Sequence, residues 1–242
     1  MDGTGTQYLD DALWEFPTTF GQPMAVAAGD FADGAGVDLV VADSDSSPSR
    51  VGALWDVDAT VPLAFDATFL DDVPGQATGH SAAVADLGRG GLTWVLGAPQ
   101  AAEGCGAVYL VDGAYDGAKQ ELSDMLAGGD ATSLGVPCTP VKGVLGFGTV
   151  LQPVRVSTGD VLAVGFPGAA LGNGEVWLWW DTTGTGELSL EEGSAGRWTG
   201  SAGAEVGTDH PGRGRGGAGA GGGRVGARRG GRERLEIGRA HV

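Results

Sequence analysis

The stretch AVADLGRGGLTWVLGAP (Ala83–Pro99), followed by GCGAVYLV (Gly104–Val111), decides the fold of this 242-residue chain. It consists of a Gly-rich turn, a β-rich run ending in Gly-Ala-Pro, and the pattern Gly-x-Val-aromatic. Related stretches occur upstream and downstream: GDFADGAGVDLVVAD (Gly29–Asp43) with RVGALW (Arg50–Trp55), and DVLAVGFP (Asp160–Pro167) with GNGEVWLWW (Gly172–Trp180). A phrase that recurs three times predicts a repeated structural unit.

The spacing of the three copies predicts the size of that unit. Ala42, Gly97 and Gly165 hold equivalent places, 55 and 68 residues apart. About four short strands fit this length, and runs such as VDLVVA and TWVLGA are β-rich and bounded by Gly, Pro or Asp. Asp112-Gly113 and Gly184-Thr185-Gly186 predict hairpin turns between third and fourth strands. Lys119–Leu126 contains helix formers but spans only about two turns, so we interpret it as strand plus loop.

This order of motifs closely resembles the FG-GAP repeat of integrin alpha subunits and of many bacterial surface proteins, over Phe20–Thr208. DATFLDDVPGQATGHSAAV (Asp66–Val84) and GRWTGSAGAEVGT (Gly196–Thr208) look like the family's connection from an outer strand into the next Phe-Gly. The resemblance implies an all-β fold, a partial β-propeller made of four-stranded antiparallel blades. About three blades and the start of a fourth are expected.

The expected boundaries follow from these motifs. Residues 1–19 are interpreted as the end of a preceding blade or a linker, and they show no signal peptide. The three blades are expected at 20–78, 79–145 and 146–199, the start of a fourth at 200–209, and a tail at 210–242. Because an open arc of blades leaves sheet faces uncovered, the chain is expected to be a fragment.

The tail differs from the body in charge. Residues 1–209 hold 29 acidic and 6 basic side chains, whereas residues 210–242 hold 2 acidic and 8 basic. An RGG-like arm for nucleic acid or anionic surfaces and a disordered Gly/Arg linker are two interpretations. We favour a third interpretation, that the tail is disordered and non-native, because GC-rich DNA that is translated out of frame gives Gly/Arg-rich sequence. In addition, Glu236–Val242 could be encoded by DNA that resembles a common sequencing-adapter sequence.

The acidic body excludes some classes of partner. Only two lysines, Lys119 and Lys142, occur in the chain, which argues against nucleic acid and anionic membranes as partners. No apolar run reaches membrane-spanning length, so no membrane span is expected.

The resemblance also implies a calcium site in the turn between first and second strands, where a hard cation takes about 6–8 oxygen ligands. Asp30 and Asp38 match the first and ninth positions of that loop, and Asp33 lies one place out of phase. Ala32 and Gly34 replace two usual ligands, so a weak Ca²⁺ site and a solvated Gly-rich turn both remain open. The second loop keeps Asp86 but carries Arg89, and the third keeps little before Asp160, so both are expected to be metal-free.

The two cysteines, Cys105 and Cys138, form an even count that does not by itself establish a bridge. In a propeller their connections emerge on the same face, so a disulfide is one interpretation, and it suits an exported protein. Two unpaired thiols are the other.

Catalytic signals are few. His80 is placed at the Phe position of its repeat and interpreted as structural, and no nucleophile elbow, phosphate loop or zinc pair occurs. Trp55, Tyr109 and Trp177 are assigned to one repeat position with a packing role between blades, and Trp179 to the same face. Trp180 points the other way and is the candidate ligand contact.

We therefore expect a non-enzymatic recognition or adhesion module on an exported or cell-surface protein, which binds a protein or carbohydrate ligand through its loops. An accessory domain of a secreted hydrolase whose catalytic part lies elsewhere is a second hypothesis. A structural spacer in a larger repeat protein is a third.

Overall fold

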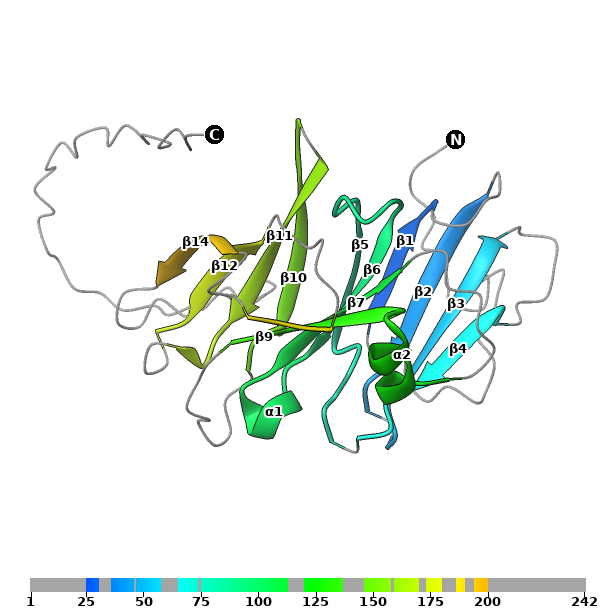
Figure 1. Cartoon of the computed structure of the whole chain (residues 1–242), viewed down its shortest axis with the longest axis horizontal. Coiled ribbons are helices and arrows are strands. Elements are labelled where there is room, and N and C mark those ends of the chain that lie inside the picture. The colour runs from blue at the N-terminus through cyan, green and yellow to red at the C-terminus, as the bar shows by residue number, and fades with distance from the viewer. Residues whose placement is uncertain are drawn as a thin grey trace, which may run out of the picture. The chain divides into compact units, whose positions relative to one another are not determined.

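The computed structural model describes residues 25–30, 36–45, 47–57, 65–73, 75–112, 120–136, 146–157, 159–169, 173–179, 186–189 and 194–199. Within these ranges the chain forms three sheets and two short helices (Figure 1). Each sheet contains four neighbouring strands that pair antiparallel. The prediction of a mainly β protein with four-stranded antiparallel sheets is confirmed.

The strands follow the repeat. The first sheet contains β1 (Ala25–Gly29), β2 (Val37–Asp43), β3 (Arg50–Val57) and β4 (Ala67–Leu70). The second contains β5 (Ser81–Ala85), β6 (Thr93–Ala98), β7 (Ala107–Asp112) and β9 (Ala131–Gly135). The third contains β10 (Val150–Val156), β11 (Gly159–Phe166), β12 (Glu175–Trp179) and β14 (Ser194–Thr199).

Strand register confirms the equivalence of the three second strands. Ala42, Gly97 and Gly165 each lie opposite a valine of the third strand, and these partners are Val51, Val108 and Val176. The residues that follow these valines are Gly52, Tyr109 and Trp177. The assignment of Trp55 to the position of Tyr109 and Trp177 is therefore wrong. A side-chain carbon at Gly52 would overlap the ring of Phe65, so there an aromatic ring from just before β4 covers a glycine.

The predicted hairpins between third and fourth strands are also wrong in the second and third units. After β7 the chain forms β8 (Gln120–Glu121), which pairs in parallel with β4 of the first sheet. After β12 it forms β13 (Gly186–Ser189), which pairs in parallel with β9 of the second sheet. Each of these connections therefore adds a fifth strand to the outer edge of the preceding sheet.

The segment predicted as strand plus loop is instead β8 followed by the helix α2 (Leu122–Gly128). Leu122 and Met125 are buried against the core between the first two sheets, and Gly129 ends the helix in the left-handed conformation. The Asp72 carboxylate accepts a hydrogen bond of 3.1 Å from the Ser123 amide in the first turn. Tertiary contacts thus stabilise a helix too short to form alone.

Two apolar cores lie between consecutive sheets. In the first core, Val40, Val51 and Ala53 of the first sheet pack with Trp94, Leu96 and Tyr109 of the second. In the second core, Val95, Val108 and Leu134 pack with Leu162, Val164 and Trp179 of the third. All six residues of β6 are buried, because both faces of the second sheet are covered. That explains its continuous apolar run without alternation.

The second and third sheets each contact the preceding sheet through a glycine that lies just before their first strand. Gly79 and Gly148 have φ of +83° and +87°, and their amides donate to the carbonyls of Gly97 and Gly165. A side-chain carbon on Gly79 would overlap the Cβ of Ala42, and one on Gly148 would lie 3.2 Å from the Cα of Gly97. The residues on both sides of this contact must therefore be small.

We expect Gly97→Ala to destabilise the protein by about 1–3 kcal/mol, the usual cost of an overpacked site. The added methyl would overlap the Gly148 carbonyl oxygen and Ser81 Oγ, whose hydrogen bond of 2.7 Å joins the second and third units. Urea unfolding followed by tryptophan fluorescence measures the change.

Gly135→Ala is the matched control, because nothing lies within 4 Å of a carbon added there. It is expected to be neutral or to stabilise by about 0.4–1 kcal/mol through the unfolded chain. Equal losses in both variants would contradict the role of the Gly97 contact.

Candidate functional site

The connections between first and second strands and between third and fourth strands emerge at the same end of each antiparallel sheet. Asp30 and Asp38 flank the first such connection, as the resemblance implied. Asp30 directly follows β1 and is exposed, and Asp38 lies opposite Gly29 in the β1–β2 ladder. Asp33 lies outside the described residues.

Asp38 has a structural role. Its side chain is almost fully buried, and Oδ1 accepts a hydrogen bond of 2.8 Å from the Asp56 amide. The Asp56 carboxylate in turn accepts one of 2.7 Å from the Gly36 amide. Asp56 itself has a φ of +47°, a conformation that is uncommon for residues other than glycine. These bonds attach the base of the first loop to the end of β3.

The fit to calcium at this loop is partial. Among the described residues no group of three or more His, Cys, Asp or Glu side chains converges as metal ligands. Asp30 and Asp38 supply carboxylate oxygens, and Ca²⁺ also accepts main-chain carbonyls as ligands. Residues 31–35, which contain Asp33, lie outside the described ranges.

The second loop contains an internal cation. The Arg89 side chain is 7% exposed, with Nε 3.0 Å from Asp112 Oδ1 and Nη2 3.0 Å from Thr132 Oγ1. The guanidinium thus joins this loop to β7 and β9. The sequence shows Arg89 as a cation in this loop, but its bonds to Asp112 and Thr132 join segments distant in sequence and could not be predicted.

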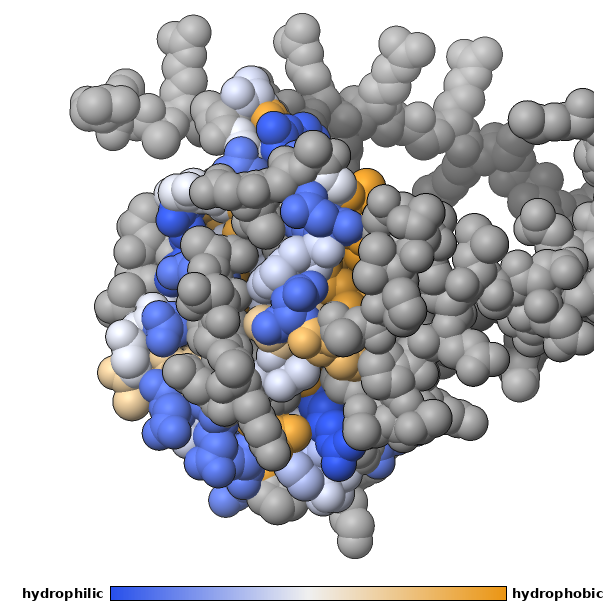
Figure 2. Space-filling view, turned by 90° about the vertical axis from the view of Figure 1, so that its right-hand side faces the viewer, coloured by the Kyte–Doolittle hydropathy of each residue, from blue (hydrophilic) through white to orange (hydrophobic). Residues whose placement is uncertain are grey.

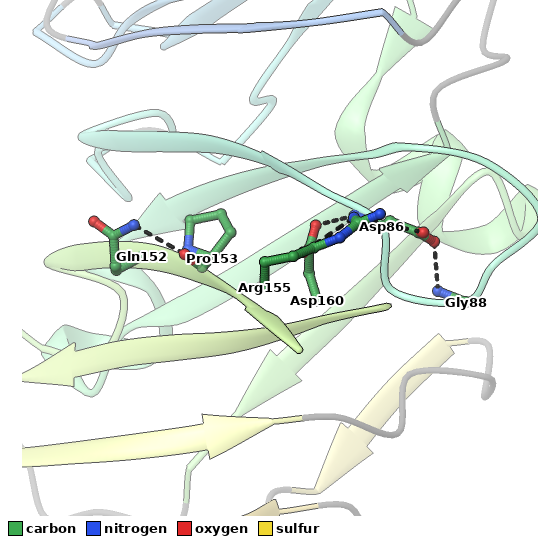
Figure 3. Close-up of polar contacts among 6 residues, drawn as sticks. All are labelled: Asp86, Gly88, Gln152, Pro153, Arg155 and Asp160. Atoms are coloured by element: carbon green, nitrogen blue, oxygen red, sulfur yellow. Dashed lines mark hydrogen bonds and ion pairs between the residues drawn. The ribbon is translucent and has the colours of Figure 1, made fainter. Parts of the chain in front are cut away.

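The second and third loops bind each other (Figure 3). The Asp86 amide donates to Asp160 Oδ2, and the Asp160 amide donates to the Asp86 carbonyl, both at 2.8 Å. Arg155 Nη1 lies 3.2 Å from Asp160 Oδ1 and 3.8 Å from Asp86 Oδ2. Since the Arg155 side chain is 70% exposed, the two hydrogen bonds donated by the Asp86 and Asp160 amides contribute more to this contact than the ion pair.

At the opposite end of the sheets, the structure corrects the assignment of His80. Because Gly79 and Gly148 are equivalent, Thr78 occupies the place of Phe147. Phe147 is fully buried and packs edge-on against Phe166. Thr78 is fully buried as well, and its hydroxyl donates a 2.6 Å hydrogen bond to Asp71 Oδ2. A polar pair thus replaces an aromatic side chain between the first two units.

Asp71 and Asp72 have opposite electrostatic environments. Burial raises the pKa of Asp71, although hydrogen bonds from Thr78 and the Val73 amide oppose that effect. Burial also acts to raise the pKa of Asp72, but the hydrogen bonds from Ser123 outweigh it, so that pKa lies below its usual value. Neither residue carries a signal in the sequence, because both lie in a connection between strands that matches no site motif.

Most of the tryptophans that the structure describes lie in the cores. Trp179 is 1% exposed, and Trp177 packs beside it in the second core, which confirms their shared face. The Trp177 indole donates to Glu175 Oε2 at 3.0 Å, and the Arg197 guanidinium lies 5.2 Å from its ring centre. Trp177 and Trp179 are therefore packing residues. Trp180 lies outside the described residues.

Cys105 lies between β6 and β7, where the sequence placed it, and is buried and disulfide-bonded. The other cysteine of the chain, Cys138, lies outside the described residues, so the Cys105–Cys138 pairing stays a prediction. Cys105 adjoins the helical turn α1 (Ala101–Gly104), in which Ala102 and Glu103 are exposed and have positive φ.

No protein-family model matches the chain, and no curated protein shows significant similarity to it. In the part of the chain that the structure describes, no helix is both long and apolar enough to cross a membrane.

Asp71→Asn and Asp72→Asn are expected to change the pH dependence of stability in opposite directions. The folded-state pKa of Asp71 is raised above 3.8, so its contribution is complete below pH 3.8 and falls as the pH rises through the folded-state value. The pKa of Asp72 is lowered, so its contribution is present above pH 3.8 and is lost as the pH falls through the folded-state value.

Urea midpoints of the two variants and the unaltered protein, measured from about pH 3 to pH 7, give these slopes. Relative to the unaltered protein, Asp71→Asn should gain stability as the pH rises, and Asp72→Asn should lose it. Slopes of the same sign in both variants would contradict the assignment.

Proposed function

We propose that this chain is a non-enzymatic recognition module of the FG-GAP type, part of an exported or cell-surface protein. It holds a protein or carbohydrate ligand through the loops at the ends of its sheets. The arrangement proposed for the sheets is that of consecutive blades of a β-propeller. Ca²⁺ binds weakly at the first loop, with Asp30 and Asp38 among its ligands.

The contact between Gly148 and Gly97 is the observation that carries the proposal. It joins the Phe-Gly of one unit to the Gly-Ala-Pro strand of the unit before it, and Gly79 with Ala42 repeats it. The two motifs of the FG-GAP pattern thus meet in one interface, which gives a steric reason for their joint occurrence. First strands of neighbouring sheets also contact each other, β1 with β5 and β5 with β10, as they do in consecutive propeller blades.

Loop presentation is supported by how the loops are anchored. The first loop is attached to β3 through Asp38 and Asp56, and the second and third are joined by Asp86 and Asp160. Rigid bases of this kind lower the entropy that a loop loses when it binds a ligand. Binding residues are disproportionately found on loops positioned by such a scaffold.

The disulfide at Cys105 and the acidic charge of the body support the proposed location and class of partner. A disulfide at Cys105 fits an oxidising compartment. The acidic body disfavours polyanionic partners, and the described residues in Figure 2 are largely hydrophilic, with hydrophobic side chains in smaller areas among them. A neutral or basic ligand surface therefore suits this protein best.

Ca²⁺ is expected to stabilise the full-length chain. At a concentration ten times the Kd, binding to the folded state adds about 1.4 kcal/mol, which raises the Tm by about 3–6 °C for a domain of this size. Asp30→Asn should abolish the shift without lowering the Tm in EDTA, since Asp30 is exposed.

The matched control is Asp86→Asn at the equivalent place in the second unit, which should keep the shift. The Tm of the unaltered chain and of the two variants is measured by thermal unfolding in EDTA, in MgCl₂ and in CaCl₂. A Ca²⁺ shift that survives Asp30→Asn places the ion elsewhere.

Recognition itself is tested by binding of the full-length chain to an array of neutral and acidic glycans and to a panel of purified extracellular proteins. Trp180→Ala should weaken the strongest signal by about 5- to 30-fold, the loss that an aromatic contact of about 1–2 kcal/mol gives. Trp198→Ala is the control, because Trp198 is 53% exposed on β14. Absence of any saturable binding would contradict a recognition function and favour a structural spacer.

A further inference from the structure

Gly106, in the connection before β7, receives the Phe-Gly segment of the next unit. A side-chain carbon on Gly106 would overlap the backbone nitrogen and oxygen of Phe147. Gly106 and Phe147 form a parallel bridge, and the Phe147 amide donates a 2.7 Å hydrogen bond to the Cys105 carbonyl. One residue later, Gly148 packs on Gly97. Gly97 and Gly106 therefore form a seat for this segment on the second sheet.

The third sheet carries the same pair of glycines. Gly165 is equivalent to Gly97, since both lie opposite a valine of the third strand, Val176 and Val108 respectively. Two residues before those valines stand Gly174 and Gly106, with φ of +77° and +85°. The third sheet thus repeats both the residue types and the backbone conformation of the seat.

The face around this second seat is apolar. Val176 and Leu178 of β12 are half-buried, and Trp198, which pairs with Val176 across β12 and β14, is 53% exposed. This face is turned away from the core that the third sheet shares with the second, because Trp177 and Trp179 alternate with Val176 and Leu178.

The chain itself contains a segment that matches the occupant. Val206-Gly207-Thr208 corresponds to Phe147-Gly148-Thr149. Gly207 follows the end of β14 by eight residues, and Gly79 follows the end of β4 by nine. The length of the connection after the fourth strand and the residue types therefore agree with those of a segment that occupies a seat.

We propose that Val206 and Gly207 dock on the third sheet, with Gly207 against Gly165 and the Val206 amide bonded to the carbonyl of Asn173, the counterpart of Cys105. The seat thus accepts a Phe-Gly-type segment that begins a further unit. This inference rests on the repeat geometry and stands independently of the recognition function.

Residue-resolved hydrogen exchange on the full-length chain tests the docking. The Val206 amide is expected to exchange at least about tenfold more slowly than in an unstructured peptide. Gly207→Val should remove this protection, because the larger side chain prevents the approach to Gly165. Gly203→Val is the control: it makes the same change in the same segment and should leave the protection of the Val206 amide unchanged.

A second pair of variants tests the seat from the other side. Gly165→Ala should remove the protection of Val206, whereas Gly135→Ala should not, and the unfolding midpoint of each shows that the fold persists. An unprotected Val206 in the unaltered chain overturns the proposal. So does protection that depends on protein concentration and ignores Gly207→Val, which would mean that a second copy covers the face.

Discussion

Steric contact between backbones is the constraint on which the other features of this structure depend. The Phe-Gly segment of one unit lies so close to the preceding unit that Gly97, Gly106 and Gly148 have no room for a Cβ. Once the backbones are at this distance, the side chains on either side fill the two cores, and Phe147 reaches Phe166. The hydrogen bond from Ser81 to the Gly148 carbonyl then fixes the register of one unit on the next. Small residues thus set the spacing, and large ones supply the apolar burial.

Much of the fold could be predicted from the sequence because these contacts impose a strict pattern. A glycine or alanine must recur opposite a valine, and β-rich runs must surround it, so the equivalence of Ala42, Gly97 and Gly165 could be predicted from the sequence. The repeated sequence pattern predicted the wrong residue where the backbone contact does not fix the residue type. Trp55 was assigned to the wrong position because Gly52 replaces the aromatic residue there, and the covering ring comes from Phe65, thirteen residues later.

The site was less predictable, since its contacts join segments distant in sequence. Asp71 with Thr78 replaces the packing of a phenylalanine, which no pattern of hydrophobic residues signals. Asp160 is bonded to Asp86 across two units, although each looked like an isolated loop carboxylate. The helix α2 was missed for the same reason: Asp72, Leu122 and Met125 stabilise it through tertiary contacts, which propensity over seven residues does not report.

The parallel strands β8 and β13 bear on how such a protein is made. Gln120 follows the end of β4 by 50 residues, and Gly186 follows the end of β9 by 51. During synthesis from the N-terminus, the first and second sheets therefore each keep an open edge until about fifty more residues have left the ribosome. An open edge is a template for pairing with another chain, so both sheets are exposed to such pairing until the following unit supplies the fifth strand. The following unit thus completes the sheet before it. A pause in translation between the two units would prolong the time during which the open edge can aggregate.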